Sequence, residues 1–259
     1  MRKLFLTFFL IFSSFIIFAQ NEDSVNFQVL TGYYGDYFNQ PYTRNFHVFY
    51  VGAGLKMPNT SIYGKVNYGY LSPESGLQFE LDYYQRLTKT TTSWWNYAYS
   101  ANDNFPGHRA MFRIWQELGA GFLISGGLQY FYFDKNLFTA NIGLEKYLGR
   151  FWVEGLAYFH FKEPDIRMSY QLNSRFFWQD YNYVQLSLRT GAAQDEPWVS
   201  AGALNSHSVG LSVVTYVNKT KKLQLRAGVG YAYEEYSEDL WRNRYTTAVG
   251  LVYTFKGGK

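Results

Sequence analysis

The feature of this sequence that most constrains its fold is a two-residue alternation of apolar and polar side chains. In the segment 77–86 the odd positions are apolar or aromatic: Leu77, Phe79, Leu81 and Tyr83. The even positions carry the more polar side chains: Gln78, Glu80, Asp82, Tyr84 and Arg86. The segments 167–178 and 184–189 repeat this pattern. Because successive side chains of a β-strand point to opposite faces, each segment predicts a strand with one apolar and one polar side.

The aromatic content indicates what these two sides face. Aromatic residues make up 21% of the chain, with 25 Tyr and 23 Phe. A soluble antiparallel sandwich also alternates, with an aliphatic core on one side and water on the other. Here the apolar side is aromatic and the polar side carries repeated Arg and Glu, which favours a lipid-facing exterior around a polar lumen. We therefore expect an all-β fold, an antiparallel up-and-down transmembrane β-barrel.

The first 20 residues predict export. Arg2 and Lys3 precede the uncharged segment 4–18, and Ala19 and Gln20 follow it. A transmembrane helix needs about 20 apolar residues, so we expect a cleaved signal peptide at residues 1–19. Residues 20–259 then form a single barrel domain, and the cell outer membrane is the expected location.

Cysteine content and charge exclude several classes of protein. The chain has no cysteine, so it has neither disulfides nor thiolate metal sites. Without Arg2 and Lys3, the chain has 22 basic and 20 acidic residues. This net charge is too small to indicate a nucleic-acid-binding protein. No two histidines share ligand spacing, and no phosphate-binding or dinucleotide motif is present. We predict no metal, no cofactor and no nucleic-acid partner.

The alternating segments predict about fourteen strands, with twelve as the alternative because the first two are weakly patterned. Their expected centres are Val29, Val51, Val66, Leu81, Tyr97, Phe112, Leu128, Ile142, Gly155, Leu172, Leu186, Val213, Ala227 and Val249. An even number of strands puts both termini on the periplasmic side, with short periplasmic turns and longer outer loops. The longest connection, residues 191–205, is a candidate plug or ligand-binding lid.

Four segments carry a resemblance to a known family. Tyr99–Arg109 contains the element Phe105-Pro106-Gly107-His108-Arg109, and further matching segments are Leu123–Phe131, Glu145–Trp152 and Ser169–Phe177. They resemble the YaiO family of outer-membrane β-barrels. The resemblance implies a barrel often found beside or fused to tetratricopeptide repeats, with no settled biochemical activity. Repeat-plus-barrel proteins of other families export exopolysaccharide, but this chain has no such repeats.

These observations favour a non-enzymatic protein: a narrow channel, or an envelope component linked to glycan export or surface assembly. The alternatives are a lipid-modifying acyl hydrolase or acyltransferase, and a plugged structural or receptor barrel. Expected partners are outer-membrane lipid, the barrel assembly machinery and glycan or envelope proteins. The aromatic segments 94–97 and 130–133 fit an interfacial girdle, or stacking against sugar rings.

The candidate functional residues lie on the polar faces of strands or at the outer rim. The expected lumen residues are Glu80, Arg86, Arg109, Arg113, Glu117, Glu145, Glu154, His160, Arg175 and Arg189. They form either a ladder of ion pairs that fills the barrel, or a charged eyelet that selects solutes by sign. The rim candidates are Phe105, Pro106, His108 and Arg109, as a structured corner or a binding site.

An enzyme would need a serine and a histidine held together by a carboxylate or amide. Four histidines are present: His47, His108, His160 and His207. None is near a serine in a recognisable nucleophile motif. We therefore predict no catalytic residues.

Overall fold

The computed structural model describes residues 25–39, 45–162, 165–193, 204–217, 220–237 and 239–256. The predicted signal peptide at residues 1–19 lies outside these ranges, and so does most of the candidate plug or lid at residues 191–205.

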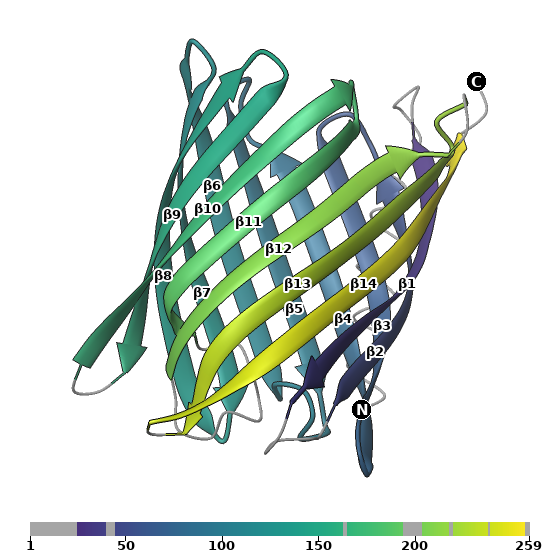
Figure 1. The fold of residues 1–259 in the computed structure, drawn as a ribbon. Coiled ribbons are helices and arrows are strands. Elements are labelled where there is room, and N and C mark those ends of the chain that lie inside the picture. Colours follow the sequence, from purple (N-terminus) through teal and green to yellow (C-terminus); the bar gives the residue numbers. More distant parts are fainter. Residues whose placement is uncertain are drawn as a thin grey trace.

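Fourteen antiparallel strands form one closed barrel (Figure 1). In chain order the strands are β1 (Asn26–Phe38), β2 (Phe46–Lys56), β3 (Thr60–Leu71), β4 (Glu74–Arg86), β5 (Thr91–Ser100), β6 (His108–Gly119), β7 (Phe122–Phe133), β8 (Lys135–Leu148), β9 (Phe151–Lys162), β10 (Asp165–Gln179), β11 (Asn182–Ala193), β12 (Leu204–Tyr216), β13 (Leu223–Ser237) and β14 (Leu240–Lys256). Each of the fourteen predicted centres lies inside its own strand. The fourteen-strand prediction is confirmed and the twelve-strand alternative is wrong.

The barrel closes where its first and last strands meet. β1 pairs with β14 from Asn26↔Lys256 to Phe38↔Arg244, and it pairs with β2 on its other side. Every described strand therefore has a partner on both sides. Closure removes the free sheet edge whose backbone N–H and C=O groups would be unpaired in lipid.

The weak pattern of β2 has a physical reason. Phe46 and Val48 face inward and are buried in an apolar cluster with Leu71 and Phe105. Gly54 lies further along the same inner face, and there the Tyr63 ring occupies the space that a side chain would take. The inner face of β2 is thus apolar or without a side chain at all positions except Tyr50 and Lys56, so the polar alternation is weak although the strand is fully paired.

Short turns gather at one end of the barrel. β1 begins and β14 ends there, and we call it the terminal end, with the loop end opposite. Five of its turns span two to four residues: 57–59, 87–90, 120–121, 149–150 and 180–181. In outer-membrane barrels this is the periplasmic end. The expectation of generally longer connections at the loop end holds for residues 101–107 but not for every connection, because residues 72–73 join β3 to β4 and Asp134 alone joins β7 to β8. There the strand pairing continues to the tip of the hairpin.

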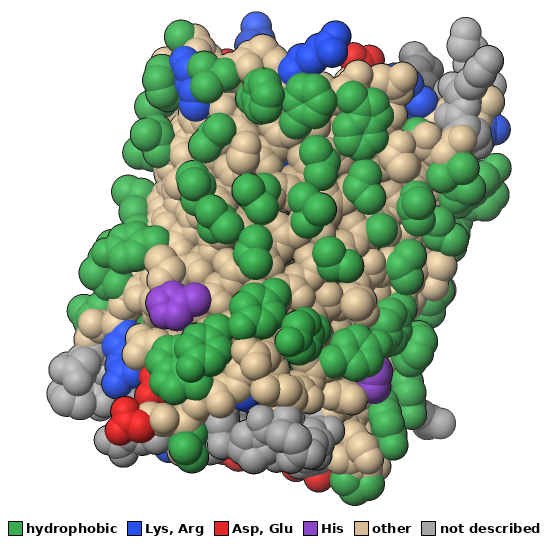
Figure 2. All heavy atoms as spheres, viewed as in Figure 1, with side chains coloured by type: hydrophobic (Ala, Val, Ile, Leu, Met, Phe, Trp, Pro, Cys, Tyr) green, Lys and Arg blue, Asp and Glu red, His purple; other side chains and the backbone are tan. Residues whose placement is uncertain are grey.

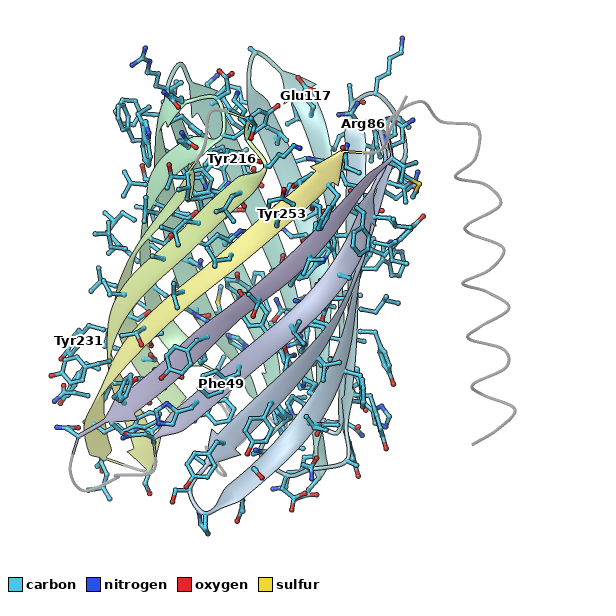
Figure 3. All side chains as sticks on the ribbon, turned by 90° about the vertical axis from the view of Figure 1, so that its right-hand side faces the viewer. Phe49, Arg86, Glu117, Tyr216, Tyr231 and Tyr253 are labelled. Carbon is cyan, nitrogen blue, oxygen red and sulfur yellow. The ribbon has the colours of Figure 1, made fainter. Side chains whose placement is uncertain are left out.

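The outer surface is apolar and the charged side chains on it lie near the two ends (Figure 2). Phe79 and Leu128 face outward with 57% and 61% of their surface exposed. Phe49 and Tyr231 also point away from the barrel (Figure 3). An exposed apolar band on this scale is the surface that lipid covers. No helix among the described residues has the length and apolar character of a membrane span.

The outward and inward faces of β12 predict opposite responses to an added charge. Leu211→Arg puts a cation on the lipid face near the middle of β12, and should lower the free energy of unfolding by about 2–4 kcal/mol. Ser212→Arg, one residue further on, faces the lumen and should cost much less. Chemical unfolding of the refolded barrel in lipid vesicles measures both values. Equal costs would contradict the assigned faces.

Candidate functional site

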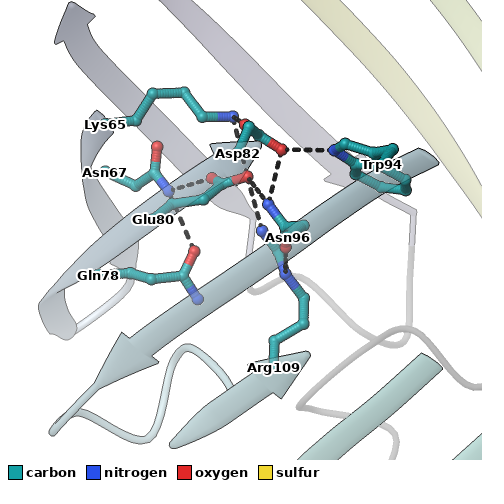
Figure 4. A network of polar contacts seen from close by, with 8 residues as sticks. All are labelled: Lys65, Asn67, Gln78, Glu80, Asp82, Trp94, Asn96 and Arg109. Carbon is teal, nitrogen blue, oxygen red and sulfur yellow. Dashed lines mark hydrogen bonds and ion pairs between the residues drawn. The ribbon is translucent and has the colours of Figure 1, made fainter. Parts of the chain in front are cut away.

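Charged side chains meet in the barrel lumen. Most of the predicted lumen residues face inward, and the structure brings them together in networks of mixed sign. The best-connected network lies on β3 to β6 around Glu80 and Asp82 (Figure 4). It contains paired acids and bases, so it resembles the predicted ladder of ion pairs more than a filter of one sign.

Glu80 is the centre of this network. Its Oε1 lies 2.8 Å from Lys65 Nζ and 2.9 Å from Arg109 Nη2. Asn96 Nδ2 donates to the same oxygen at 2.8 Å, and Asn67 Nδ2 donates to Oε2 at 3.0 Å. Both oxygens of the carboxylate are thus bonded, which is what a mostly buried charge requires.

Asp82 extends the network toward the terminal end. Its Oδ2 lies 3.0 Å from Lys65 Nζ, and its Oδ1 accepts from Asn96 at 2.9 Å. Trp94 Nε1 donates to the same Oδ1 at 2.9 Å. Lys65 therefore bridges two carboxylates, and an inward-facing indole is anchored to the network.

A second network surrounds Arg113 on β6 to β10. Its Nη2 lies 2.5 Å from Glu154 Oε1 and 3.5 Å from Glu145 Oε1. Trp115 Nε1 and Trp152 Nε1 donate to the two oxygens of Glu145 at 2.7 and 3.0 Å. The two glutamates are buried, and one guanidinium links them.

A third network at the loop end was not predicted in full. Arg242 Nε donates to Glu234 Oε1 at 2.7 Å, and Arg244 Nη2 lies 3.3 Å from Glu234 Oε2. Thr246 Oγ1 donates to Asp36 Oδ1 at 2.5 Å. Asp36 lies between Gly35 and Tyr37, and Lys65 between Gly64 and Val66. Asn243 stands between Arg242 and Arg244 on the opposite face, so a search for polar alternation misses all four. Each of these residues occupies one of the alternate positions of β1, β3 or β14 that face the lumen, and that position is the signal that could have identified them.

The remaining lumen candidates lie apart from these networks. Arg175 lies over the Trp152 and Tyr183 rings, 4.2 and 4.8 Å from their centroids. Arg189 lies 5.2 Å from the Tyr158 ring centroid. Arg86 and Glu117 are exposed at the terminal end (Figure 3). The structure therefore divides the predicted set between a packed interior and an open rim.

The connection between β5 and β6 folds inward at the loop end. Phe105 is buried against Phe46, Val48 and Leu71. A Cβ atom at Gly69 would lie 2.6 Å from the Phe105 ring, so the missing side chain makes room for it. Beside it, Asn104 Nδ2 donates to the Gly69 carbonyl oxygen at 2.9 Å, and Pro106 is also buried. We call residues 102–106 the mouth segment.

His108 lies at the rim on the outer surface and not in the lumen. Its Nδ1 is 2.9 Å from Tyr97 Oη, and the Tyr99 ring is 5.3 Å away. His47 and His207 also lie among outward aromatic rings at the loop end. Rings with polar tips are typical of the membrane interface, so these three histidines belong to the aromatic girdle.

His160 faces the lumen but is almost completely buried, with 1% of its surface exposed. Its Nε2 lies 2.9 Å from Ser169 Oγ, and its Nδ1 lies 3.0 Å from Thr139 Oγ1. Ser169 has no exposed surface. A nucleophilic serine must reach its substrate, so this arrangement does not favour acyl transfer. Within the described ranges, the titratable side chains form no cluster of three metal ligands.

One wall of the lumen carries small side chains. Ser208, Gly210 and Ser212 on β12 and Gly228 and Gly230 on β13 face inward and are partly exposed. The ion-pair networks occupy β3 to β10 and the loop end of β1, β13 and β14. These five residues therefore keep surface that water can reach in the middle of the inner face of β12 and β13.

The comparisons with known proteins agree with this architecture. A profile of the YaiO membrane beta barrel domain matches residues 26–196. This chain belongs to the YaiO family. The match covers the mouth segment and the first two networks, so both lie in the YaiO domain. The YaiO resemblance of the four segments is thereby confirmed.

Several solved structures are similar to this YaiO protein, one of them with a TM-score above 0.5. A bacterial polysaccharide outer membrane secretin is 9% identical, with a TM-score of 0.53, over 89% of this chain and 98% of its own. OmpF of Salmonella typhi in complex with daunomycin is 9% identical, with a TM-score of 0.49, over 89% and 97%. OpdL of Pseudomonas aeruginosa is 8% identical, with a TM-score of 0.47, over 90% and 98%. A search of curated proteins found no match.

Removal of Glu80 should destabilise the barrel because it leaves Lys65 and Arg109 in the lumen with one carboxylate fewer. We expect Glu80→Gln to lower the free energy of unfolding by about 3 kcal/mol. The double variant Lys65→Met/Glu80→Gln should lose less than the sum of the two single changes. Lys221→Ala breaks an exposed pair with Asp180 and should cost about 0–1 kcal/mol. Unfolding titrations measure the free energy of unfolding of each variant. If the losses of the two single variants simply add in the double variant, Lys65 and Glu80 are not coupled.

Proposed function

We propose that this protein is a non-enzymatic outer-membrane barrel that forms a narrow, water-filled passage. The passage is entered from the periplasm at the terminal end. At the loop end the mouth segment closes it at rest. An acyl hydrolase is disfavoured by the burial of Ser169 beside His160.

The observation that carries the proposal is the partly exposed inner wall of β12 and β13. Ser208, Gly210 and Ser212 face the lumen and keep surface that water can reach. A barrel filled only for rigidity would cover such a wall with large side chains, as Arg113 and Leu156 do around Gly143. Small, polar side chains along one wall are what a narrow water path requires.

The two ends of the lumen differ in a way that supports a one-sided closure. At the loop end the inward side chains include the buried Phe38, Phe46, Phe105 and Phe131. At the terminal end the inward Arg86, Glu117 and Arg226 are exposed. Solutes can therefore enter the terminal end more readily than the loop end.

The mouth segment is suited to act as a movable closure. It belongs to a connection of seven residues, 101–107, and not to a strand. Its described links to the wall include the hydrogen bond from Asn104 to Gly69 and the apolar packing of Phe105. Connections that depend on few contacts open at lower free-energy cost than paired strands.

A plugged structural barrel is the second candidate. The three ion-pair networks favour it, since they cross-link the wall from within. The two candidates predict different behaviour in a membrane. A passage conducts ions when the mouth segment is displaced, whereas a plugged barrel stays silent.

Single-channel recording of the refolded mature protein in a planar bilayer tests the proposal. We expect small or infrequent openings in the parent protein and a several-fold larger open fraction or conductance in Phe105→Ala. Gly69→Val should have the same effect, because its side chain would collide with the Phe105 ring.

Gly64→Val is the matched control. Gly64 lies on the same strand, but a Cβ atom there would meet nothing within 4 Å, so conductance should not change. Folding of each variant is checked by heat-modifiable mobility on a gel. If the folded Phe105→Ala and Gly69→Val variants show no conductance in the bilayer, the proposed passage is wrong and the plugged structural barrel takes its place.

A further inference from the structure

Large aromatic side chains face inward near the terminal end of the barrel. Each lies among the five residues of its strand nearest that end, on β3 to β9. They are Tyr63, Tyr84, Trp94, Trp115, Tyr147 and Trp152, and we call them the aromatic arc. Since they face the lumen, the membrane interface does not explain them.

The arc differs in kind from the inward aromatic residues at the loop end. There the buried rings include four phenylalanines, of which Phe46 and Phe105 pack together in an apolar cluster. The arc contains only Tyr and Trp, whose rings combine an apolar face with a polar tip. Tyr84 and Tyr147 keep 40% and 47% of their surface exposed. The arc therefore offers aromatic surface to whatever enters the terminal mouth.

The polar tips of four of the six arc residues are held by the wall. Trp94 is anchored on Asp82, and Trp115 and Trp152 share Glu145. Tyr63 Oη donates to Gln28 Oε1 at 2.8 Å. Rings fixed in this way lose little conformational entropy when a ligand stacks on them.

Part of the arc forms a continuous aromatic surface. The Tyr84 and Trp94 rings are nearly parallel, with centroids 6.2 Å apart and planes 23° apart. The Tyr63 ring meets Tyr84 edge-on at 6.4 Å. Adjoining faces of this kind suit a chain of flat, repeated units, which can shift from one ring to the next.

The exposed charge beside the arc is mainly positive. Lys56, Arg86 and Arg226 face inward at the terminal mouth and are exposed, and among the described strand residues that do so Glu117 is the one acid. Arg226 approaches Tyr63 and Tyr84 closely enough to interact with them electrostatically. A ligand that stacks on the arc would therefore have cations within reach.

We propose that the aromatic arc binds an acidic glycan chain on the periplasmic side. The C–H groups on a pyranose face carry partial positive charge and fit the negative face of an aromatic ring. Carboxylates on the sugar units would pair with Arg86 and Arg226, for which a guanidinium is well suited. An acidic glycan is then the substrate class of the proposed passage. Transport of the glycan rests on that proposed passage, but its binding needs no opening of the mouth segment.

Isothermal titration calorimetry of the full mature barrel in detergent micelles tests the proposal. It measures the affinity for tetragalacturonate, with maltotetraose as the neutral comparison. We expect tetragalacturonate to bind more tightly, and its affinity to fall with added salt. Tyr84→Leu and Trp94→Leu should each weaken binding about fivefold. Arg226→Gln should weaken tetragalacturonate binding and leave maltotetraose binding unchanged.

The neighbouring residues supply matched controls. Tyr83→Leu and Trp95→Leu remove the same side chains one position away, on the outward face of the same strands, and should leave binding unchanged. If Trp94→Leu does not fold because Asp82 loses a donor, Tyr147→Leu tests the arc instead, with the outward Leu148→Ala as its control.

The outcomes separate this proposal from the passage itself. Absence of tetragalacturonate binding to the folded parent protein would overturn the glycan site, whatever the bilayers show. Equal losses in inward and outward variants would do the same, and equal affinity for maltotetraose would overturn the acidic class. Binding with silent bilayers would keep the site and remove the passage.

Discussion

The structure depends on the backbone hydrogen bonds that join β1 to β14. In hydrocarbon, an unpaired N–H or C=O group costs several kcal/mol, so a sheet of this size is stable in lipid only when it has no edge. Once the first and last strands pair from Asn26↔Lys256 to Phe38↔Arg244, alternate side chains must face a closed lumen. The charged side chains, the aromatic arc and the mouth segment all follow from that enclosure.

Enclosure also decides the chemistry of the lumen. A charge that faces inward has little water to solvate it, so it needs a partner from a neighbouring strand. Lys65 and Glu80 meet this need between adjacent strands, whereas Arg109 reaches Glu80 past β5 and Arg113 reaches Glu145 and Glu154 past β7. Such cross-links stiffen the wall of β3 to β10. The wall of β12 and β13 carries Ser and Gly, and it stays accessible to water.

The two mouths of the lumen use aromatic residues for opposite purposes. Phe105 and its apolar neighbours have no polar tip, and their packing excludes water at the loop end. Tyr84 and Trp94 keep a polar tip and a partly exposed ring at the terminal end. On the outer surface Tyr97 and His108 meet the lipid interface. Position relative to the wall, and not aromatic content alone, thus determines the role of each ring.

The sequence by itself determined the fold class, the number of strands and the face of nearly every strand residue. Two-residue periodicity is a local property, and Glu80, Arg113 and Arg175 could be assigned to the lumen from it. What periodicity could not supply is which lumen residues meet, because partners such as Arg113 and Glu154 come from strands far apart in the chain. It also could not place Phe105 inside the mouth, since residues 101–107 follow no strand pattern. Only closure of the barrel brings these side chains together, because the distance between them depends on strand order, register and curvature, and none of these is a property of a single segment.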